Sequence, residues 1–530
     1  MKIINYFIFC GLIISIIACN PQPEKEEKKE NPKSEGSISN TYKPAYFEND
    51  KRVEKIKEIA PEIHRLVKEQ GKAKNIPGIA YGIVVDNELV VASATGLINL
   101  ENKLPATTKS AFRIASMTKS FTAMAIMKLR DEGRLSLYDP VHKYIPEMSG
   151  LEYLTSDAPI INIKNLLTMT AGFPEDNPWG DRQLDESDQM LIDLIADGVS
   201  FSNPASYEFE YSNTGYALLG NIISRISGKS YQEYIRENIL LPLKMEHTYW
   251  EYDSVPKNHL AHGYRWENDQ WKLEPMIHDG SFGAIGGLIT TIEDFSKYVS
   301  LHLSAWPPRS ETDNGPVKRS TLREMHTAQY VNLYAKSKDW NNKHCAFIWG
   351  YGFGLGVGEN CNGIKMVSHS GALPGFGSSY IFFPEYGVGI MAFGNLTYTM
   401  PRPGKEIAKL LFETIDLQAR KLPVSDILLK KQEQLVKLIQ AWDKDIEVKI
   451  LAENFYLDKS REHRMSEIQE ILDKAGAIQN IEEMEPVNQL RGSFKLKAEN
   501  GFIEIFFTLT LEKYPKVQQL DVSYQPNEVK

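Results

Sequence analysis

The chain has 530 residues, a net charge of −9, 42% hydrophobic and 24% charged residues, an ordinary globular composition. This composition excludes a wholly disordered chain, a collagen-like fibre and a coiled coil. The acidic balance argues against a general nucleic-acid-binding protein, and the lack of a repeat with a period of about 20–50 residues argues against a solenoid or propeller.

The N-terminal residues have the pattern of an export signal. Lys2 precedes an almost continuous apolar stretch over residues 3–17, which is typical of a signal peptide and short for a bilayer span. The stretch ends in Ile-Ile-Ala-Cys at residues 16–19 and resembles a bacterial lipobox, in which the cysteine is acylated. We therefore predict a lipoprotein signal peptide over 1–18 and lipidation of Cys19; an ordinary secretory signal is the alternative.

A charged tether is predicted to follow over residues 19–47. Its first part, Pro21–Pro32, is rich in Glu, Lys and Pro and cannot bury enough apolar surface to fold. The predicted protein is thus exported and attached by its lipid to a bacterial membrane, on the periplasmic or cell-surface face.

The first folded region, predicted over residues 48–420, begins with a helix and a hairpin. Five apolar residues recur at helical spacing: Val53, Ile56, Ala60, Ile63 and Val67. Two apolar runs, 76–85 and 89–94, then flank Asp86-Asn87 and predict a β-hairpin. Residues 113–132 are apolar on nearly all sides, which indicates a buried helix, and Gly133 is expected to end that helix in a left-handed conformation.

The rest of this region predicts a helical insert and further strands. A mostly helical and loop-rich stretch runs to about residue 270. Strand-like runs then alternate with turns at residues 350–357, 365–370, 379–383 and 388–393, and a helix follows over 407–417. The predicted fold is α+β: an antiparallel sheet flanked by helices, with strands from both ends of the region and an all-helical lobe between them.

A small α+β C-terminal domain is predicted over residues 424–530, which is long enough for its own core. Helices are expected at 426–443, 446–455 and 465–476, and strands at 491–497, 502–511 and 517–522.

Four cysteines are present, and two of them, Cys345 and Cys361, lie outside the N-terminal segment. An exported pair can form a disulfide, but sequence gives no distance between the two, so the pairing stays open. Neither belongs to a Cys-x-x-Cys pair, and no His-Glu-x-x-His pattern occurs. We predict no metal site and no cofactor.

Two Ser-x-x-Lys pairs are candidates for a nucleophile and its base, Ser116–Lys119 and Ser254–Lys257. Pro256 breaks the helix that would align the second pair. The first pair opens the buried helix, where positions i and i+3 are neighbours and the helix N-terminus favours a developing oxyanion. Apolar surroundings would lower the pKa of Lys119 so that it acts as a base; a surface lysine is the alternative.

Two further polar elements accompany this pair. Tyr211-Ser212-Asn213 stands directly before an amphipathic helix over residues 214–228, whereas a second Tyr-x-Asn at 330–332 has no such helix. His369-Ser370-Gly371 ends a predicted strand, whereas His278-Asp279-Gly280 leads into a glycine-rich run.

With these motifs the chain resembles the serine β-lactamase and penicillin-binding-protein superfamily, specifically its class-C-like branch. The resemblance covers about residues 50–415. It is carried by residues 112–119 (Phe-Arg-Ile-Ala-Ser-Met-Thr-Lys), 163–172, 211–216 and the Gly-Gly-Leu at 286–288. It implies a sheet flanked by helices with an all-helical lobe.

The resemblance implies a role for each motif residue. Ser116 would be the nucleophile, and Lys119 and Tyr211 would share the general-base work. Asn213 would hold a substrate carbonyl, and the backbone N–H groups of Ser116 and Ala372, beside Gly371, would form the oxyanion hole.

His369 departs from the lactamase pattern, in which a lysine usually stands at this position; the resemblance places histidine in esterases and D-amino-acid peptidases. A histidine is a weaker, pH-dependent cation and would hold a substrate carboxylate less firmly. The loop Phe173–Arg182, with Pro174, Pro178 and Trp179, is expected to border the pocket.

The predicted function is therefore that of an exported serine hydrolase that acts through an acyl-Ser116 intermediate. Its substrate would be a small molecule or peptide: an ester, a D-amino-acid peptide or amide, or a β-lactam-like compound, with an esterase or peptidase favoured over an efficient β-lactamase. The alternative is a binding or sensing protein that kept the fold and lost turnover. No nucleic acid and no obligate protein partner are predicted.

Overall fold

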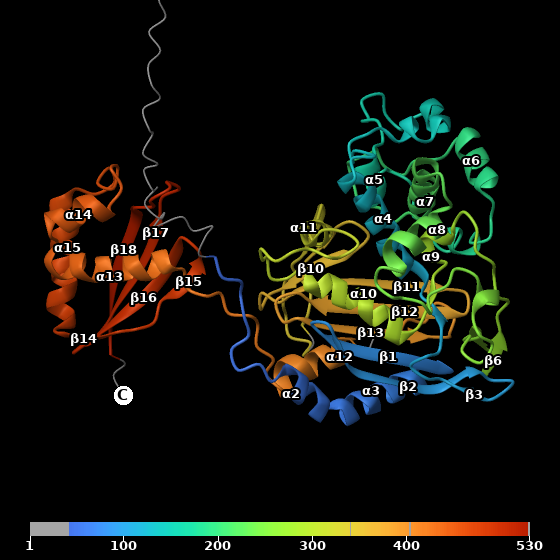
Figure 1. Ribbon diagram of the computed structural model, residues 1–530, viewed down its shortest axis with the longest axis horizontal. Helices are drawn as coiled ribbons and strands as arrows, with labels where there is room; N and C mark the ends of the chain where they lie inside the picture. The colour runs from blue at the N-terminus through green and yellow to red at the C-terminus, as the bar shows by residue number, and fades with distance from the viewer. Residues whose placement is uncertain (1–41, 340, 402–403, 528–530) are drawn as a thin grey trace, which may run out of the picture. The chain divides into compact units, whose positions relative to one another are not determined.

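A computed structural model describes residues 42–339, 341–401 and 404–527 (Figure 1). The predicted signal peptide, the predicted lipidation residue Cys19 and almost all of the predicted tether lie outside the described residues. The described chain divides into two compact units, Lys43–Pro423 and the part from Val424 onward. Each unit is described by itself.

The first unit is built on a large antiparallel sheet. Within the described residues it has nine strands, in the order β3 (Leu104–Pro105), β2 (Glu88–Asn99), β1 (Gly78–Val85), β13 (Val388–Gly394), β12 (Phe376–Phe383), β11 (Lys365–Leu373), β10 (Gly356–Asn360), β9 (Phe347–Tyr351) and β8 (Tyr330–Tyr334). Strand β1 pairs with β13, with Tyr81 opposite Ala392. The two ends of the region therefore meet in one sheet, as the sequence predicts.

Helices cover both faces of this sheet (Figure 1). On one face, α2 (Arg52–Glu58), α3 (Ala60–Ala73) and α12 (Gly404–Lys409) pack through Ile56, Ile63 and Ile407 against Ile83 and Ile390. On the other face lies α10 (Ile292–Ser304), whose Phe295 contacts Phe393 at 5.4 Å between ring centroids. The flanked antiparallel sheet confirms the predicted α+β class.

The helical lobe joins the two halves of the sheet. Its helices are α4 (Lys119–Asp131), α5 (Ile163–Leu167), α6 (Asp188–Ala196), α7 (Asn213–Ser227), α8 (Tyr231–Ile235) and α9 (Gly283–Gly286). Three short elements lie beside it: the pair β4 (Phe112–Arg113) and β7 (Ile289–Thr290), the hairpin β5 (Tyr264–Glu267) and β6 (Gln270–Leu273), and α11 (Arg319–Met325). Among the described helices, none combines the length and apolarity that crossing a bilayer requires.

Some predicted elements are wrong in their bounds. The predicted helix over 113–132 begins only at Lys119, because Arg113 pairs in β4 and Ala115–Thr118 form a 3₁₀ turn, η1. Its end is confirmed, with Gly133 at φ 72°. The predicted strand over 350–357 is the end of β9, a turn and the start of β10, since Gly354 has φ 72° and reverses the chain.

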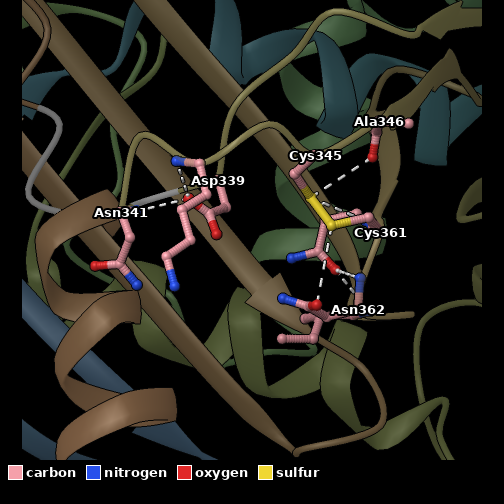
Figure 2. The surroundings of a disulfide bond; sticks show 9 residues. Asp339, Asn341, Cys345, Ala346, Cys361 and Asn362 are labelled. Atoms are coloured by element: carbon pink, nitrogen blue, oxygen red, sulfur yellow. Dashed lines mark hydrogen bonds between the residues drawn. A yellow bond between two sulfur atoms is a disulfide. The ribbon is translucent and has the colours of Figure 1, made fainter.

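Cys345 and Cys361 form a disulfide, 16 residues apart in sequence (Figure 2). Cys345 lies just before β9 and Cys361 just after β10, so the bond joins the open end of this hairpin. The backbone N–H of Cys361 also donates to Cys345 Sγ (3.2 Å).

The second unit is a small α+β fold. Its helices are α13 (Asp426–Ala441), α14 (Lys444–Ile450) and α15 (Arg461–Ala475). Its antiparallel sheet has the order β14 (Ile478–Ile481), β16 (Arg491–Ala498), β17 (Gly501–Leu509) and β18 (Val517–Pro526), with β15 (Glu485–Asn488) also paired to β16. Ile503, Ile505 and Phe507 on β17 pack with Leu435 and Ile468 of the helices in one core. Strands β14 and β15 were not predicted because each has only four residues and neither alternates between apolar and polar positions.

Candidate active site

Ser116 lies in a tight turn between a strand and a helix. The turn η1 follows β4 and leads directly into α4. Ala115, the residue before Ser116, has φ 51°, a conformation that is uncommon for a residue with a Cβ and that clusters at functional sites. The side chain of Ser116 is only 7% exposed but lines a cavity, so a substrate can reach it.

Lys119 lies one turn further along and contacts Ser116 directly. Its Nζ donates to Ser116 Oγ (3.1 Å) and to the carbonyl of Ile285 in α9 (3.1 Å). The lysine is fully buried, and burial lowers its pKa to about 7, although the carboxylates of Asp181 and Asp176 oppose that shift. A large fraction of the lysine is therefore neutral near pH 7, which is the form that accepts a proton.

Tyr211 approaches the same hydroxyl from the start of α7. The Ser212 side chain caps this helix by accepting from the N–H of Gly215 (3.2 Å). The phenol of Tyr211 hydrogen-bonds Ser116, and Lys119 Nζ lies 5.0 Å from the centroid of the Tyr211 ring. Burial raises the pKa of Tyr211 well above 10, so the phenol keeps its proton.

Gly371 allows strand β11 to lie against the turn that holds Ser116. A Cβ at this position would stand 2.4 Å from the carbonyl oxygen of Ile114 and 2.7 Å from the backbone nitrogen of Ser116. Ala372 follows on β11 and lines the cavity together with Ser116. The close packing brings the two backbone segments of the predicted oxyanion hole together; their role stays a prediction.

His369 lines the cavity as a neutral imidazole. Its Nδ1 contacts the carbonyl oxygen of Ser370 (2.7 Å), and its Nε2 contacts the hydroxyl of Tyr351 (3.4 Å). Burial, reinforced by the charge of Lys119, lowers the pKa of His369 to about 3. The pocket thus has no permanent cation at the position where a lysine stands in the lactamase pattern.

Asn213 does not line the cavity. It is fully buried behind the loop Phe173–Arg182, with its side-chain amide 2.7 Å from that of Asn177. Gly180 is packed so tightly on it that a Cβ there would stand 2.7 Å from Asn213 Cβ. The structure therefore places Asn213 under the loop, and its predicted contact with substrate stays a prediction.

The loop Phe173–Arg182 borders the cavity, as predicted. Asn177, Pro178 and Asp181 line it, whereas Trp179 is outside the lining and packs on Phe282 (5.9 Å between centroids). Asp176 fixes the loop to α7, because its carboxylate accepts from the backbone N–H groups of Asn213 (2.6 Å) and Thr214 (2.8 Å). The same helix N-terminus thus positions both the loop and Tyr211.

Sequence reasoning missed a carboxylate and several aromatic side chains in the cavity, whose volume is about 570 Å³. The carboxylate is Asp181, 3% exposed, and burial raises its pKa to about 6. The aromatic residues that join Tyr211 in the lining are Phe209, Trp349, Tyr351 and Tyr398. Asp181 lies in a loop that the sequence does place at the pocket, so an acidic residue there was a usable signal. Trp349 and Tyr351 come from strand β9, and Phe209 and Tyr398 lie outside the strands; none of these aromatic residues belongs to a motif.

Across the part of the chain that the structure describes, no group of three or more His, Cys, Asp or Glu side chains is arranged to hold a metal ion.

Comparisons with known proteins agree with this geometry. The family model described as Beta-lactamase matches residues 63–413, which include every proposed catalytic residue. The chain is 30% identical over 365 residues to Beta-lactamase-like protein 2 of Dictyostelium discoideum, covering 64% of this chain and 62% of that protein. It is 28% identical to Protein flp of Staphylococcus aureus, covering 63% of each. The chain thus spans less than two thirds of the length of these curated relatives.

Solved structures share the fold at low sequence identity. The octameric penicillin-binding protein homologue from Pyrococcus abyssi superposes with a TM-score of 0.56 at 23% identity, covering 88% of this chain and 98% of that one. A class C β-lactamase superposes with a TM-score of 0.54 at 20% identity, covering 69% and 98%.

Proposed function

Because this chain belongs to the β-lactamase family, we propose that it is a serine hydrolase that forms an acyl intermediate on Ser116. The observation that carries the proposal is the 3.1 Å contact between Lys119 Nζ and Ser116 Oγ at the base of a cavity. Burial gives this lysine the lowered pKa that a general base near neutral pH needs.

The proposed reaction has two halves. Neutral Lys119 takes the proton of Ser116 as Oγ attacks the substrate carbonyl, and the backbone N–H groups beside Gly371 stabilise the tetrahedral oxyanion. The proton then passes to the leaving group as its bond to the acyl carbon breaks, which leaves an ester on Ser116. Water hydrolyses that ester by the reverse sequence and returns the proton to the serine. Tyr211 stays a neutral phenol and passes protons between these groups.

We propose that small esters or D-amino-acid derivatives are better substrates than penicillins or cephalosporins. His369 supports this preference, because its pKa of about 3 keeps it neutral. A lactam carboxylate would lack the charged partner that a lysine supplies, a loss of about 1.5–3 kcal/mol, or one to two powers of ten in affinity. An ester without a carboxylate does not need that partner.

A parallel substrate screen tests this proposal. The purified protein and its Ser116→Ala variant would be assayed on short acyl nitrophenyl esters, D-Ala-D-Ala peptides and a chromogenic cephalosporin. We expect turnover of esters or D-amino-acid substrates, little turnover of the cephalosporin, and none by the variant. Covalent labelling of Ser116 without turnover of any substrate would favour the binding or sensing alternative.

We also propose that the mature protein is exported and held at a bacterial membrane by a lipid on Cys19, as its lipobox-like N-terminus indicates. Cys19→Ser should then release the protein from the membrane fraction with its hydrolase activity intact, since the lipid supplies the anchoring free energy. The matched control is Cys10→Ser, which lies before the processing site and should leave the protein membrane-bound. Sedimentation of the Cys19→Ser protein with membranes would contradict the assignment.

A further inference from the structure

The cavity above Ser116 lacks the positive charge that a site for anionic ligands would need. Among the described residues that line it, there is no lysine or arginine, and the one carboxylate is Asp181. His369 is neutral. Lys119 lies beneath the serine, outside the lining, and must be neutral to act as base.

Aromatic rings surround the rest of the cavity. Phe209 stands at their centre and contacts Trp349 edge-to-face (5.2 Å between centroids) and Tyr351 (5.4 Å). Tyr211 and Tyr398 also line the space. The face of the Tyr211 ring lies 5.0 Å from Lys119 Nζ, and an aromatic face attracts a cation at such a distance.

The carboxylate of Asp181 has only neutral hydrogen-bond donors among the described side chains. Asn213 Nδ2 donates to Oδ1 (3.4 Å), and the amide of Asn177, turned to satisfy its neighbours, donates to both carboxylate oxygens at 3.2 and 3.3 Å. A buried carboxylate without a close charged partner is costly, and a cation in the cavity would supply that partner.

We propose that this pocket recognises substrates that carry a positively charged ammonium group, which Asp181 and the aromatic rings around Phe209 bind. The inference rests on the proposed hydrolase function and narrows its substrate class. A neutral His369 only deprives an anionic group of a charged partner, whereas the Asp181 carboxylate supplies a partner for a cationic group.

Pairs of esters that differ only in charge test the proposal. One pair places the charge in the acyl group: the nitrophenyl esters of 4-(trimethylammonio)butyrate and of its neutral isostere, 5,5-dimethylhexanoate. The other places it in the alcohol: acetylcholine and 3,3-dimethylbutyl acetate. The measured quantity is kcat/KM for the cationic ester divided by kcat/KM for the neutral ester of the same pair. A comparison of this ratio between two proteins cancels the difference in intrinsic reactivity between the two esters.

We expect Asp181→Asn to lower this ratio at least about tenfold for one of the pairs, the size of a desolvated cation contact. The matched control is Glu175→Gln, which removes the same charge from the same loop at an exposed position outside the cavity lining and should leave the ratio unchanged. An equal effect of Asp181→Asn on both members of both pairs would overturn the proposal, since Asp181 would then act only through Lys119.

The unaltered protein offers a second test that does not depend on the folding of a variant. Protonation of Asp181, whose pKa is raised to about 6, removes its charge, so the cationic-to-neutral ratio should fall as pH drops through that value. The charged groups that act on Asp181 are Lys119, Asp176 and Arg182; they affect both esters of a pair alike. A ratio that stays constant between pH 5 and 8 for both pairs would contradict the proposal.

Binding separates this inference from the hydrolase proposal. Butyltrimethylammonium should bind the unaltered protein at least about tenfold more tightly than Asp181→Asn, whether or not the protein turns over any ester. Cation binding that depends on Asp181 in a protein without turnover would refute the hydrolase proposal alone. Turnover of esters with equal cation affinity in both proteins would refute the inference alone.

Discussion

The two Ser-x-x-Lys pairs of this chain share a spacing and differ in everything around them. Ser116 and Lys119 are buried at the junction of η1 and α4, with the lysine amine on the serine hydroxyl at 3.1 Å. Ser254 ends a 3₁₀ turn over Tyr252–Ser254, and both it and Lys257 are exposed, with Pro256 between them. No hydrogen bond joins the second pair among the described residues.

The two pairs therefore differ in burial and not in spacing, and burial is what lowers the pKa of a lysine toward the value that a general base needs. Exposure leaves an amine solvated and protonated near pH 7, whereas burial lowers the pKa of Lys119 to about 7. Packing also positions Ser116, because the lack of a Cβ at Gly371 lets strand β11 lie close to the backbone nitrogen of Ser116.

The largest expected effect is the loss of the nucleophile. Ser116→Ala should abolish hydrolysis and covalent labelling by serine-reactive probes, since the proposed intermediate needs its Oγ. Ser254→Ala should match the unaltered protein in both assays. If labelling persists in Ser116→Ala, another residue is the nucleophile, and burial does not identify Ser116–Lys119 as the catalytic pair.

Removal of the base should cost less. Lys119→Ala should lower kcat by roughly 10²–10⁴, the usual size of a general-base contribution. Lys257→Ala is the matched control and should have no effect on kcat. A Lys119→Ala protein that folds, as judged by circular dichroism, and keeps full activity would assign the base role to another group.

A larger side chain at Gly371 tests the geometry of the turn that holds Ser116. Gly371→Ala would place a Cβ 2.4 Å from the carbonyl oxygen of Ile114 and should push β11 away from Ser116. We expect kcat to fall by about 10²–10³, as for loss of one oxyanion donor. Gly150→Ala, where an added Cβ meets no atom within 4 Å, should leave kcat unchanged.

The smallest expected effect is on the pH dependence of turnover. Lys119 acts as base only when deprotonated, so kcat/KM for an uncharged ester should rise with pH and level off above about 7. One pH unit below that value, about one tenth of the lysine is neutral and the rate should be about tenfold lower. A profile that is flat from pH 5 to 8 would exclude a lysine base with a pKa of about 7.

The sequence predicted the parts of this molecule that follow from local patterns. The stop at Gly133 and the strand-like runs separated by turns, including the run at 388–393, have local signals. They led to the α+β fold and to a sheet with strands from both ends of the region, which pair as β1 and β13. The start of α4 was misplaced because an apolar run does not distinguish a strand end and a 3₁₀ turn from the first turns of a helix.

The site was predictable only where its residues belong to motifs. Asn213 lies in a motif, yet the structure buries it under Gly180, which no periodicity indicates. Asp181 and Trp349 meet in one cavity although 168 residues separate them in sequence, and such a contact depends on how β9 is placed in the sheet. The charge of the pocket therefore depends on tertiary packing, which local sequence patterns do not reveal.

Mass spectrometry of a rapidly quenched reaction can detect the proposed transfer of an acyl group to Ser116. After mixing with a nitrophenyl ester and acid quenching, we expect a mass increase equal to the acyl group on the peptide that contains Ser116. The increase should be absent from Ser116→Ala and present in Ser254→Ala. An acyl group on any other residue, or turnover in Ser116→Ala, would contradict the account.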